Sequence, residues 1–358
     1  MIQDRKEMLN AIRIGQSRIS TGSATYIIAE MSANHGQSYD KAVKIIHAAK
    51  EAGADAIKLQ TYTPETITIN CDNEYFRIGK GTIWEGKNLY ELYKEAYTPW
   101  EWQPKLKKVA DGLGLDLFST PFDNTAVGFL EEMNVPAYKI ASFELVDIPL
   151  IQYVAKTGRP IIMSTGMATL AEIDEALTTA RGAGCKELAL LKCTSAYPAD
   201  PAEMNLRTIH NMAETFQVPV GLSDHTLGIA VPIAAVALGV CCIVEKHFTL
   251  SRAIPGPDSA FSLEPHEFKA MVEAIRITEK VLGKISYEVT EKEAASRVFR
   301  RSLFVVKDMK AGDIFTQVNI RSIRPGYGLS TKYMDIILGK RAKQDIGLGT
   351  PLNWNLIG

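Results

Sequence analysis

Eight short apolar runs alternate with segments of helical spacing, and this alternation limits the possible folds more than any other feature of the chain. The runs begin at residues 26, 56, 115, 137, 160, 188, 218 and 241. Their near-continuous hydrophobicity is typical of parallel strands that are buried on both faces. Intervening segments such as "DKAVKIIHAAKEAGA" have amphipathic spacing and a glycine stop. The pattern predicts an α/β fold, a (β/α)₈ TIM barrel; a doubly wound sheet is the lesser alternative, because no GxGxxG turn follows the first strand.

The carboxyl-terminal residues differ in charge from the rest of the chain. Residues 297–358 hold 11 Lys or Arg and 4 Asp, a net charge of +7, whereas the whole chain of 358 residues has −1. Short runs such as "SLFVV" and the glycines of "RPGYGLS" predict a small, loop-rich β fold. We therefore predict a barrel domain over residues 1–285, a linker over 286–296 and a β-rich domain over 297–358. Aromatic residues are too scattered there for nucleic-acid stacking, so a basic cap over an anion site is favoured over a nucleic-acid partner.

The chain has no sequence signal for a membrane. No stretch reaches the 18 or so uncharged apolar residues that a spanning helix needs. The opening "MIQDRKEMLN" lacks the apolar core of a signal peptide. A cytoplasmic location without membrane contact is expected.

Polar residues stand at the carboxyl end of almost every predicted strand, where TIM barrels carry their chemistry. These residues are Glu30, Lys58, Gln60, Ser119, Thr120, Lys139, Ser142, Ser164, Thr194, Ser195, Ser223, Asp224, His225, Glu245, Lys246 and His247. About half of the hydroxyls have the alternative role of capping the next helix. Lysines inside strands are seldom buried without a partner, so the two lysines predict a site for a small, multiply charged anion such as phosphate.

Two imidazoles end neighbouring strands, His225 in "GLSDHT" and His247 in "EKHFTL". Each alone has the ordinary alternative of a structural histidine. Together, without thiolates and beside carboxylates, they indicate ligands of a catalytic divalent metal with open positions.

An insertion over residues 63–99 separates the second and third strands, and it predicts a structure that overhangs the active face. Residues 75–102 carry three of the four tryptophans of the chain. This aromatic surface fits an acetamido-sugar, and a small core for the insertion itself is the equal alternative.

The chain resembles the sialic acid synthase family from about residue 20 to its end. The resemblance is carried by motifs that include "AEMSANHGQS", "FSTPFD", "YKIASFE", "LKCTSAYPA", "EKHFTL", "GPDSAFSLEP" and "RRSLFVVKDMKAGD". It implies a TIM barrel followed by an antifreeze-like (SAF) domain, and a domain-swapped homodimer in which the cap of one chain closes the barrel of the other. It also implies condensation of phosphoenolpyruvate with an open-chain acetamido-hexose, release of phosphate, and help from a divalent cation, Mn²⁺ or Mg²⁺.

The resemblance also implies roles for individual residues. The expected ligands of the phosphate and carboxylate are Lys58, Thr120, Lys139, Ser142, Ser164 and Ser223, with Gln60, Ser195 and Tyr197 among the substrate-binding residues. Glu30 would handle protons on the attacking water or hold the cation at C2, and Glu144 would lie on the sugar side. Asp258 would reach the metal through water, and Arg324 would reach the sugar in the barrel of the partner subunit.

One departure from the family bears on the sugar. Where N-acetylneuraminate synthases read "CTNEYP", this chain reads "CTSAYP", so Ser195 and Ala196 replace an Asn and a Glu. The smaller pair favours pseudaminic acid as the product, with N-acetylneuraminate and legionaminate as alternatives. Two other classes stay open: a Schiff-base aldolase that uses Lys58 or Lys139, and a carbohydrate- or ice-binding role for the carboxyl-terminal module.

Overall fold

The computed structural model describes residues 11–358. The opening segment 1–10, for which no signal peptide was predicted, lies outside the described residues. The described chain forms two compact units, one ending at Gly283 and one spanning Lys284–Gly358. No helix among the described residues is long and apolar enough to cross a membrane.

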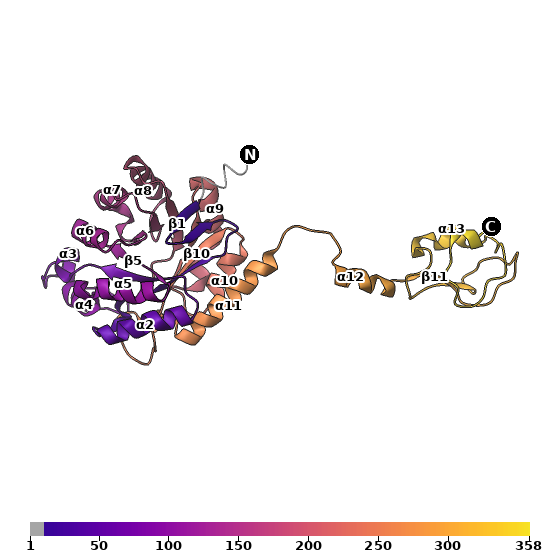
Figure 1. The fold of residues 1–358 in the computed structure, drawn as a ribbon, viewed down its shortest axis with the longest axis horizontal. Helices are drawn as coiled ribbons and strands as arrows, with labels where there is room; N and C mark the ends of the chain where they lie inside the picture. The colour runs from indigo at the N-terminus through magenta and orange to yellow at the C-terminus, as the bar shows by residue number, and fades with distance from the viewer. Residues whose placement is uncertain (1–10) are drawn as a thin grey trace. The chain divides into compact units, whose positions relative to one another are not determined.

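Eight parallel strands close into a barrel in the order β10-β3-β4-β5-β6-β7-β8-β9, which confirms the predicted TIM barrel (Figure 1). All eight predicted apolar runs form strands. Residues on both faces of these strands are buried, which explains their near-continuous hydrophobicity. The strands are β3 (Tyr26–Glu30), β4 (Ala56–Thr61), β5 (Asp116–Pro121), β6 (Tyr138–Ile140), β7 (Ile161–Ser164), β8 (Leu188–Cys193), β9 (Val220–Asp224) and β10 (Cys241–His247).

A helix follows each strand and packs its apolar stripe against the barrel (Figure 1). Several begin at a side-chain cap that satisfies the free N–H groups of the first turn, such as Asp123 before α6 and Thr169 with Glu172 at α8. The helices are α2 (Tyr39–Glu51), α5 (Gln103–Gly112), α6 (Asn124–Glu132), α7 (Ile148–Ala155), α8 (Leu170–Gly182), α9 (Arg207–Phe216), α10 (Ala230–Ala237) and α11 (Pro265–Leu282). The insertion adds α3 (Pro64–Ile67), η2 (Glu74–Phe76), α4 (Leu89–Ala96) and η3 (Trp100–Trp102).

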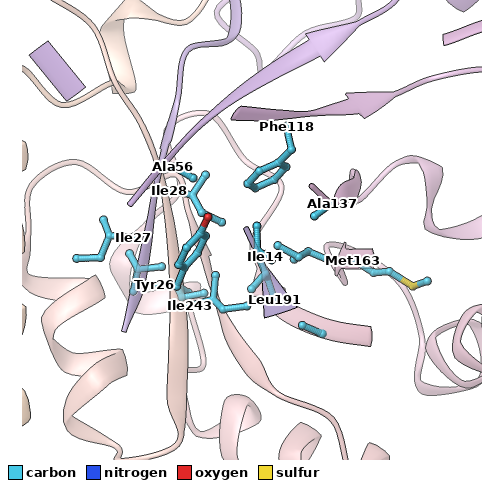
Figure 2. Packing of buried hydrophobic residues seen from close by; sticks show 14 of the residues in the cluster. Ile14, Tyr26, Ile27, Ile28, Ala56, Phe118, Ala137, Met163, Leu191 and Ile243 are labelled. Carbon is cyan, nitrogen blue, oxygen red and sulfur yellow. The ribbon is translucent and has the colours of Figure 1, made fainter. Parts of the chain in front are cut away.

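An antiparallel hairpin, β1 (Ala11–Ile14) and β2 (Ser17–Ser20), closes the amino-terminal end of the barrel. Ile14 is fully buried, and Figure 2 shows it among barrel side chains such as Phe118 and Leu191. The hairpin meets residues at the start of two strands. The Arg13 backbone N–H donates to Glu187 before β8, and Gly15 lies against the side chain of Asp116 at the start of β5. Gly15 has φ +54°, and a Cβ there would lie 2.1 Å from an Asp116 oxygen, so glycine is required on both counts.

The second unit contains a small antiparallel pair, β11 (Ser302–Val305) and β12 (Ile320–Ile323), which confirms the predicted β-rich character. It has its own core, which includes Leu303, Phe315 and Leu352. Helices α12 (Glu291–Ser296) and α13 (Met334–Ile337) belong to the same unit. At Gly328 a Cβ would lie 2.2 Å from the Leu303 carbonyl oxygen, so the "RPGYGLS" loop can pack against β11 only with glycine there.

Candidate active site

The carboxyl ends of β3, β4 and β10 place a carboxylate, an amine and an imidazole side by side. In the strand register Glu30 is the neighbour of Lys58 on β4 and of His247 on β10. All three side chains are buried. Parallel strands end at the same face of a barrel, which is why residues more than 200 positions apart in the sequence meet here.

Lys58 is the centre of a buried cluster of charges. Its Nζ lies 2.8 Å from Glu30 and 3.6 Å from Glu245, and it donates to the Thr120 hydroxyl at 3.2 Å. Burial opposes the charge of Lys58, but Glu245 and Glu30 outweigh it and raise the pKa of the ammonium. The two carboxylates respond differently. Burial raises the pKa of Glu30, whereas in Glu245 the attraction of Lys139, Lys58 and His225 overcomes burial and lowers the pKa.

The second lysine lies two strands away from Lys58 at the same end of the barrel. Lys139 on β6 donates to the Ser164 hydroxyl on β7 at 2.7 Å, and burial lowers its pKa. Two further hydroxyls, those of Ser142 and Ser195, lie 2.8 Å apart. Gly166 passes so close to them that a Cβ would be 2.3 Å from Ser142 Cβ. The result is a wall of amines and hydroxyls suited to an anion with several oxygens.

The two predicted histidines lie together, with ring centroids 5.4 Å apart. His225 Nδ1–H donates to the Thr194 carbonyl at 3.0 Å, so Nε2 is the acceptor nitrogen in the neutral ring. Burial opposes the charge of His225, but neighbours led by Cys193 raise its pKa. Burial lowers the pKa of His247 well below its usual range, so this ring is neutral.

The imidazole pair fits a divalent metal in part. Among the residues that the structure describes, His247 Nδ1 is buried without a hydrogen-bond partner, and so is Glu245 Oε2. Buried polar atoms of this kind call for a ligand, an ion or a water. No group of three or more His, Cys, Asp or Glu side chains within residues 11–358 forms a metal site. The protein alone therefore offers two imidazoles, and further ligands would come from water or substrate.

An aromatic group surrounds the imidazoles. The Tyr197 ring lies 4.3 Å from that of His225, and the Phe261 ring 4.9 Å from that of His247. The insertion reaches this group through Trp84, whose ring lies 5.6 Å from Tyr197 and whose Nε1–H donates to the Pro257 carbonyl at 2.9 Å. Trp84 of the insertion thus borders the space at the carboxyl ends of the strands, here called the cup, and serves more than a local core.

The remaining predicted residues are Glu144, Asp258, Gln60 and Arg324. Glu144 follows β6 on η4 (Glu144–Val146), and burial raises its pKa to about 7. Asp258 accepts from the Ser32 hydroxyl and from the Ala33 N–H at 3.3 Å. Gln60 Nε2 joins this network, donating to Glu30 and Ser32 at 2.9 Å each. Arg324 belongs to the second unit, and its action on a partner's barrel stays a prediction.

Comparison with known proteins decides the family. Residues 45–287 match the NeuB family, and residues 300–357 match the SAF domain. The chain belongs to the NeuB family. It is a nonulosonic acid synthase, a phosphoenolpyruvate-condensing enzyme, which confirms the resemblance to the sialic acid synthases.

Relatives of the NeuB-family chain match it over nearly its full length. Pseudaminic acid synthase of Campylobacter jejuni is 46% identical over 93% of this chain and 96% of that protein. N,N'-diacetyllegionaminic acid synthase of Legionella pneumophila is 37% identical over 93% and 94%. The crystal structure of N-acetylneuraminic acid synthetase from Leptospira borgpetersenii, in complex with citrate, covers 80% of this chain and 95% of that one, with 31% identity and a TM-score of 0.71.

Two side chains of this NeuB-family site escaped the sequence-based assignment. Glu245 stands at a strand end, yet it lies between Lys58 and Ser223, whose hydroxyl donates to it at 3.3 Å. The sequence does contain a signal for Glu245: it lies two residues before His247 on the same strand, and alternate residues of a strand face the same side. Ser32 gave no comparable signal, since it lies in a 3-10 turn after β3 and has φ +44°.

Proposed function

We propose that the protein is a pseudaminic acid synthase, which condenses phosphoenolpyruvate with 2,4-diacetamido-2,4,6-trideoxy-L-altrose. The observation that carries this proposal is the full-length similarity to a pseudaminic acid synthase, 46% against 37% for a legionaminic acid synthase. Ser195 and Ala196 support the same product, since a site without the longer polar pair suits a sugar with a C6 methyl and a second acetyl group.

The amines and hydroxyls form the proposed site for phosphoenolpyruvate. Lys58 with Thr120 and Lys139 with Ser164 are two hydrogen-bonded pairs on four consecutive strands, the first on β4 and β5 and the second on β6 and β7. Each pair supplies an ammonium and a hydroxyl, which suits a phosphate or a carboxylate. Ser142 adds a hydroxyl group after β6, and Ser195 and Ser223 add hydroxyl groups from the ends of β8 and β9.

The imidazoles of His225 and His247 are the proposed protein ligands of a divalent cation, Mn²⁺ or Mg²⁺. The tautomer that the Thr194 carbonyl imposes on His225 and the unpartnered Nδ1 of His247 support this role. When bound, such an ion supplies a Lewis acid that polarises the sugar aldehyde.

The carboxylates divide the proton chemistry. C3 of phosphoenolpyruvate bonds to the aldehyde carbon, whose oxygen takes up a proton, while positive charge develops at C2. Water adds to C2 and gives up one proton. The C2–O bond to phosphate then breaks, and the C2 hydroxyl passes its proton to the departing phosphate and becomes the ketone of the product. Glu30, whose pKa burial raises, is the proposed acceptor of the water proton, and the ionised Glu245 stabilises the cationic carbon. Glu144 is the proposed acid or base on the sugar side.

Trp84, Tyr197 and Phe261 form the proposed apolar wall for the sugar. Their rings lie within 6.5 Å of one another and border the imidazole pair. Aromatic faces of this kind pack well against methyl and acetamido groups. A domain-swapped homodimer would add Arg324 to this wall from the partner subunit.

Phosphate release tests the proposal. The purified protein is incubated with phosphoenolpyruvate, Mn²⁺ and either the altrose isomer, the corresponding mannose isomer or N-acetylmannosamine. We expect phosphate with the altrose isomer and little with N-acetylmannosamine; a preference for the mannose isomer would reassign the product to legionaminate. With ¹⁸O at the bridging position of phosphoenolpyruvate, the label should appear in phosphate. Trapping of a covalent adduct by borohydride would instead support a Schiff-base aldolase.

A further inference from the structure

A buried ion pair lies directly behind the two imidazoles. Side chains alternate between the two faces of a strand, so the residues that precede His225 and His247 point away from the cup. These residues are Asp224 and Lys246, which are neighbours in the register of β9 and β10. Lys246 Nζ lies 2.5 Å from Asp224 Oδ2, and both side chains are completely buried.

The ammonium of Lys246 holds the chain on both sides of His225. Besides the carboxylate of Asp224, it donates to the backbone carbonyl of Thr226. Asp224 closes the ring, because its carboxylate accepts from the Thr226 N–H at 2.9 Å and from the Thr226 hydroxyl at 3.1 Å. Lys246, which precedes His247, thus binds Asp224 and Thr226, the residues before and after His225.

The two imidazoles differ in how else they are held. His225 has its own hydrogen bond to the Thr194 carbonyl. His247 Nδ1 has no hydrogen-bond partner among the described residues, and its ring lies 4.9 Å from the Phe261 ring. The position of the His247 ring therefore depends on the backbone of β10. Lys246, the residue before His247, fixes this backbone through its bonds to Asp224 and Thr226.

Stability alone is a poor reason for this pair. A buried ion pair commonly contributes no more to stability than well-packed apolar residues of similar size, because the cost of removing two charges from water offsets their attraction. A fixed separation between two strand ends is, by contrast, what two ligands of one metal require.

We propose that Asp224 and Lys246 are positioning residues, which set the separation of His225 and His247 for a shared divalent cation. This inference rests on the proposed metal-binding role of the two imidazoles. It assigns the pair no contact with substrate or metal.

The test is a double variant, Asp224→Asn/Lys246→Met, which removes both charges and leaves none unpaired. Asn keeps an acceptor for the Thr226 N–H, and Met fills the space of the lysine stem. Calorimetric titration with Mn²⁺, without substrates, should give a Kd about 10- to 100-fold higher than for the unaltered protein. Circular dichroism should show a folded protein with a similar melting temperature.

The matched control is Asp55→Asn/Arg276→Met, which removes an ion pair of 3.2 Å between the residue before β4 and helix α11. It should leave the Kd for Mn²⁺ within about twofold. A folded Asp224→Asn/Lys246→Met variant with an unchanged Kd would overturn the inference. If the double variant fails to fold, Asp224→Asn/Lys246→Gln, which also leaves no charge unpaired and keeps polar groups at both positions, decides the question by the same measurement, with at least a threefold rise expected.

A third variant separates this inference from the proposal on which it rests. His247→Ala should abolish specific Mn²⁺ binding. If the unaltered protein binds no Mn²⁺, or if His247→Ala binds it equally well, the metal proposal itself fails. If His247→Ala loses binding and the double variant does not, only the positioning role fails.

Discussion

The two ends of the barrel bury very different side chains. At the amino-terminal end Ile12, Ile14 and Ile19 of the hairpin are buried, and charged neighbours such as Asp116 are only half-buried. At the carboxyl end Lys58, Lys139, Glu30 and Glu245 are all fully buried. Burying charge destabilises a fold unless each charge is paired, so the carboxyl end carries a cost that the opposite end avoids. The contrast assigns stability to one end and chemistry to the other.

The largest effect that would sharpen this contrast is expected for His247→Ala. Loss of a Lewis acid is worth several kcal/mol of transition-state stabilisation, so kcat should fall at least about 10³-fold. The melting temperature should stay close to that of the unaltered protein, because the variant removes a buried nitrogen that has no partner in the described structure. Elemental analysis should find little bound metal. Normal turnover with unchanged metal content would contradict the ligand assignment, and His225→Ala is expected to behave in the same way.

The reverse behaviour is expected for Ile14→Ala at the opposite end. Ile14 is completely buried, and truncating such a side chain costs about 2 to 4 kcal/mol of unfolding free energy. Urea denaturation measures this loss, while KM for both substrates should not change. Ile277→Ala on helix α11 is the control, because that side chain is 61% exposed and should cost less than about 0.5 kcal/mol. A changed KM in Ile14→Ala would break the separation of the two ends.

Lys58→Met tests whether the buried amines serve phosphoenolpyruvate. Loss of a charge-assisted contact to a multiply charged anion costs about 2 to 3 kcal/mol, so KM for phosphoenolpyruvate should rise roughly 30- to 150-fold. KM for the sugar should change much less. Lys192→Met is the control, since Lys192 Nζ donates to the Cys193 carbonyl on its own strand. Equal losses for both substrates would remove Lys58 from the phosphate site.

The stability of the protein should fall with rising pH because of Glu144. Burial raises its pKa from 4.5 to about 7, so the folded protein holds this proton more tightly than the unfolded chain does. The resulting stability is complete below pH 4.5 and is lost as the pH rises through 7. Between pH 5 and pH 8 the loss should be roughly 2 kcal/mol. Urea denaturation at the two pH values should give a smaller difference for Glu144→Gln; an equal difference would show that Glu144 does not titrate in this range.

The smallest effect is expected for Tyr90→Phe. The Tyr90 hydroxyl donates to Glu65 within the insertion, so this ring is not held toward the imidazoles as Trp84 is. KM for the sugar should change less than about twofold in Tyr90→Phe and about tenfold in Trp84→Ala. A large rise in KM for the sugar in Tyr90→Phe would show that the proposed apolar wall for the sugar extends along the insertion.

The local pattern of the chain was enough to predict the barrel and most of the cup. Each strand is a continuous apolar run, and TIM barrels have their polar strand ends on one face. The hairpin over residues 11–20 was missed, because its strands have four residues each and alternate only briefly. Glu245 was seen at a strand end but was not assigned a role, since its partners Lys58 and Ser223 come from other strands.

The order of elements, the identity of the polar strand ends and the basic charge of the last domain could all be read from the sequence, because they follow from spacing and composition. Which of the two buried carboxylates has its pKa raised and which has it lowered follows from the tertiary structure alone. Glu30 and Glu245 are the same residue type at two strand ends, yet burial raises the pKa of one, and two lysines with a histidine lower the pKa of the other. Such a difference arises from distances of a few ångströms between strands, which no pattern along one strand contains.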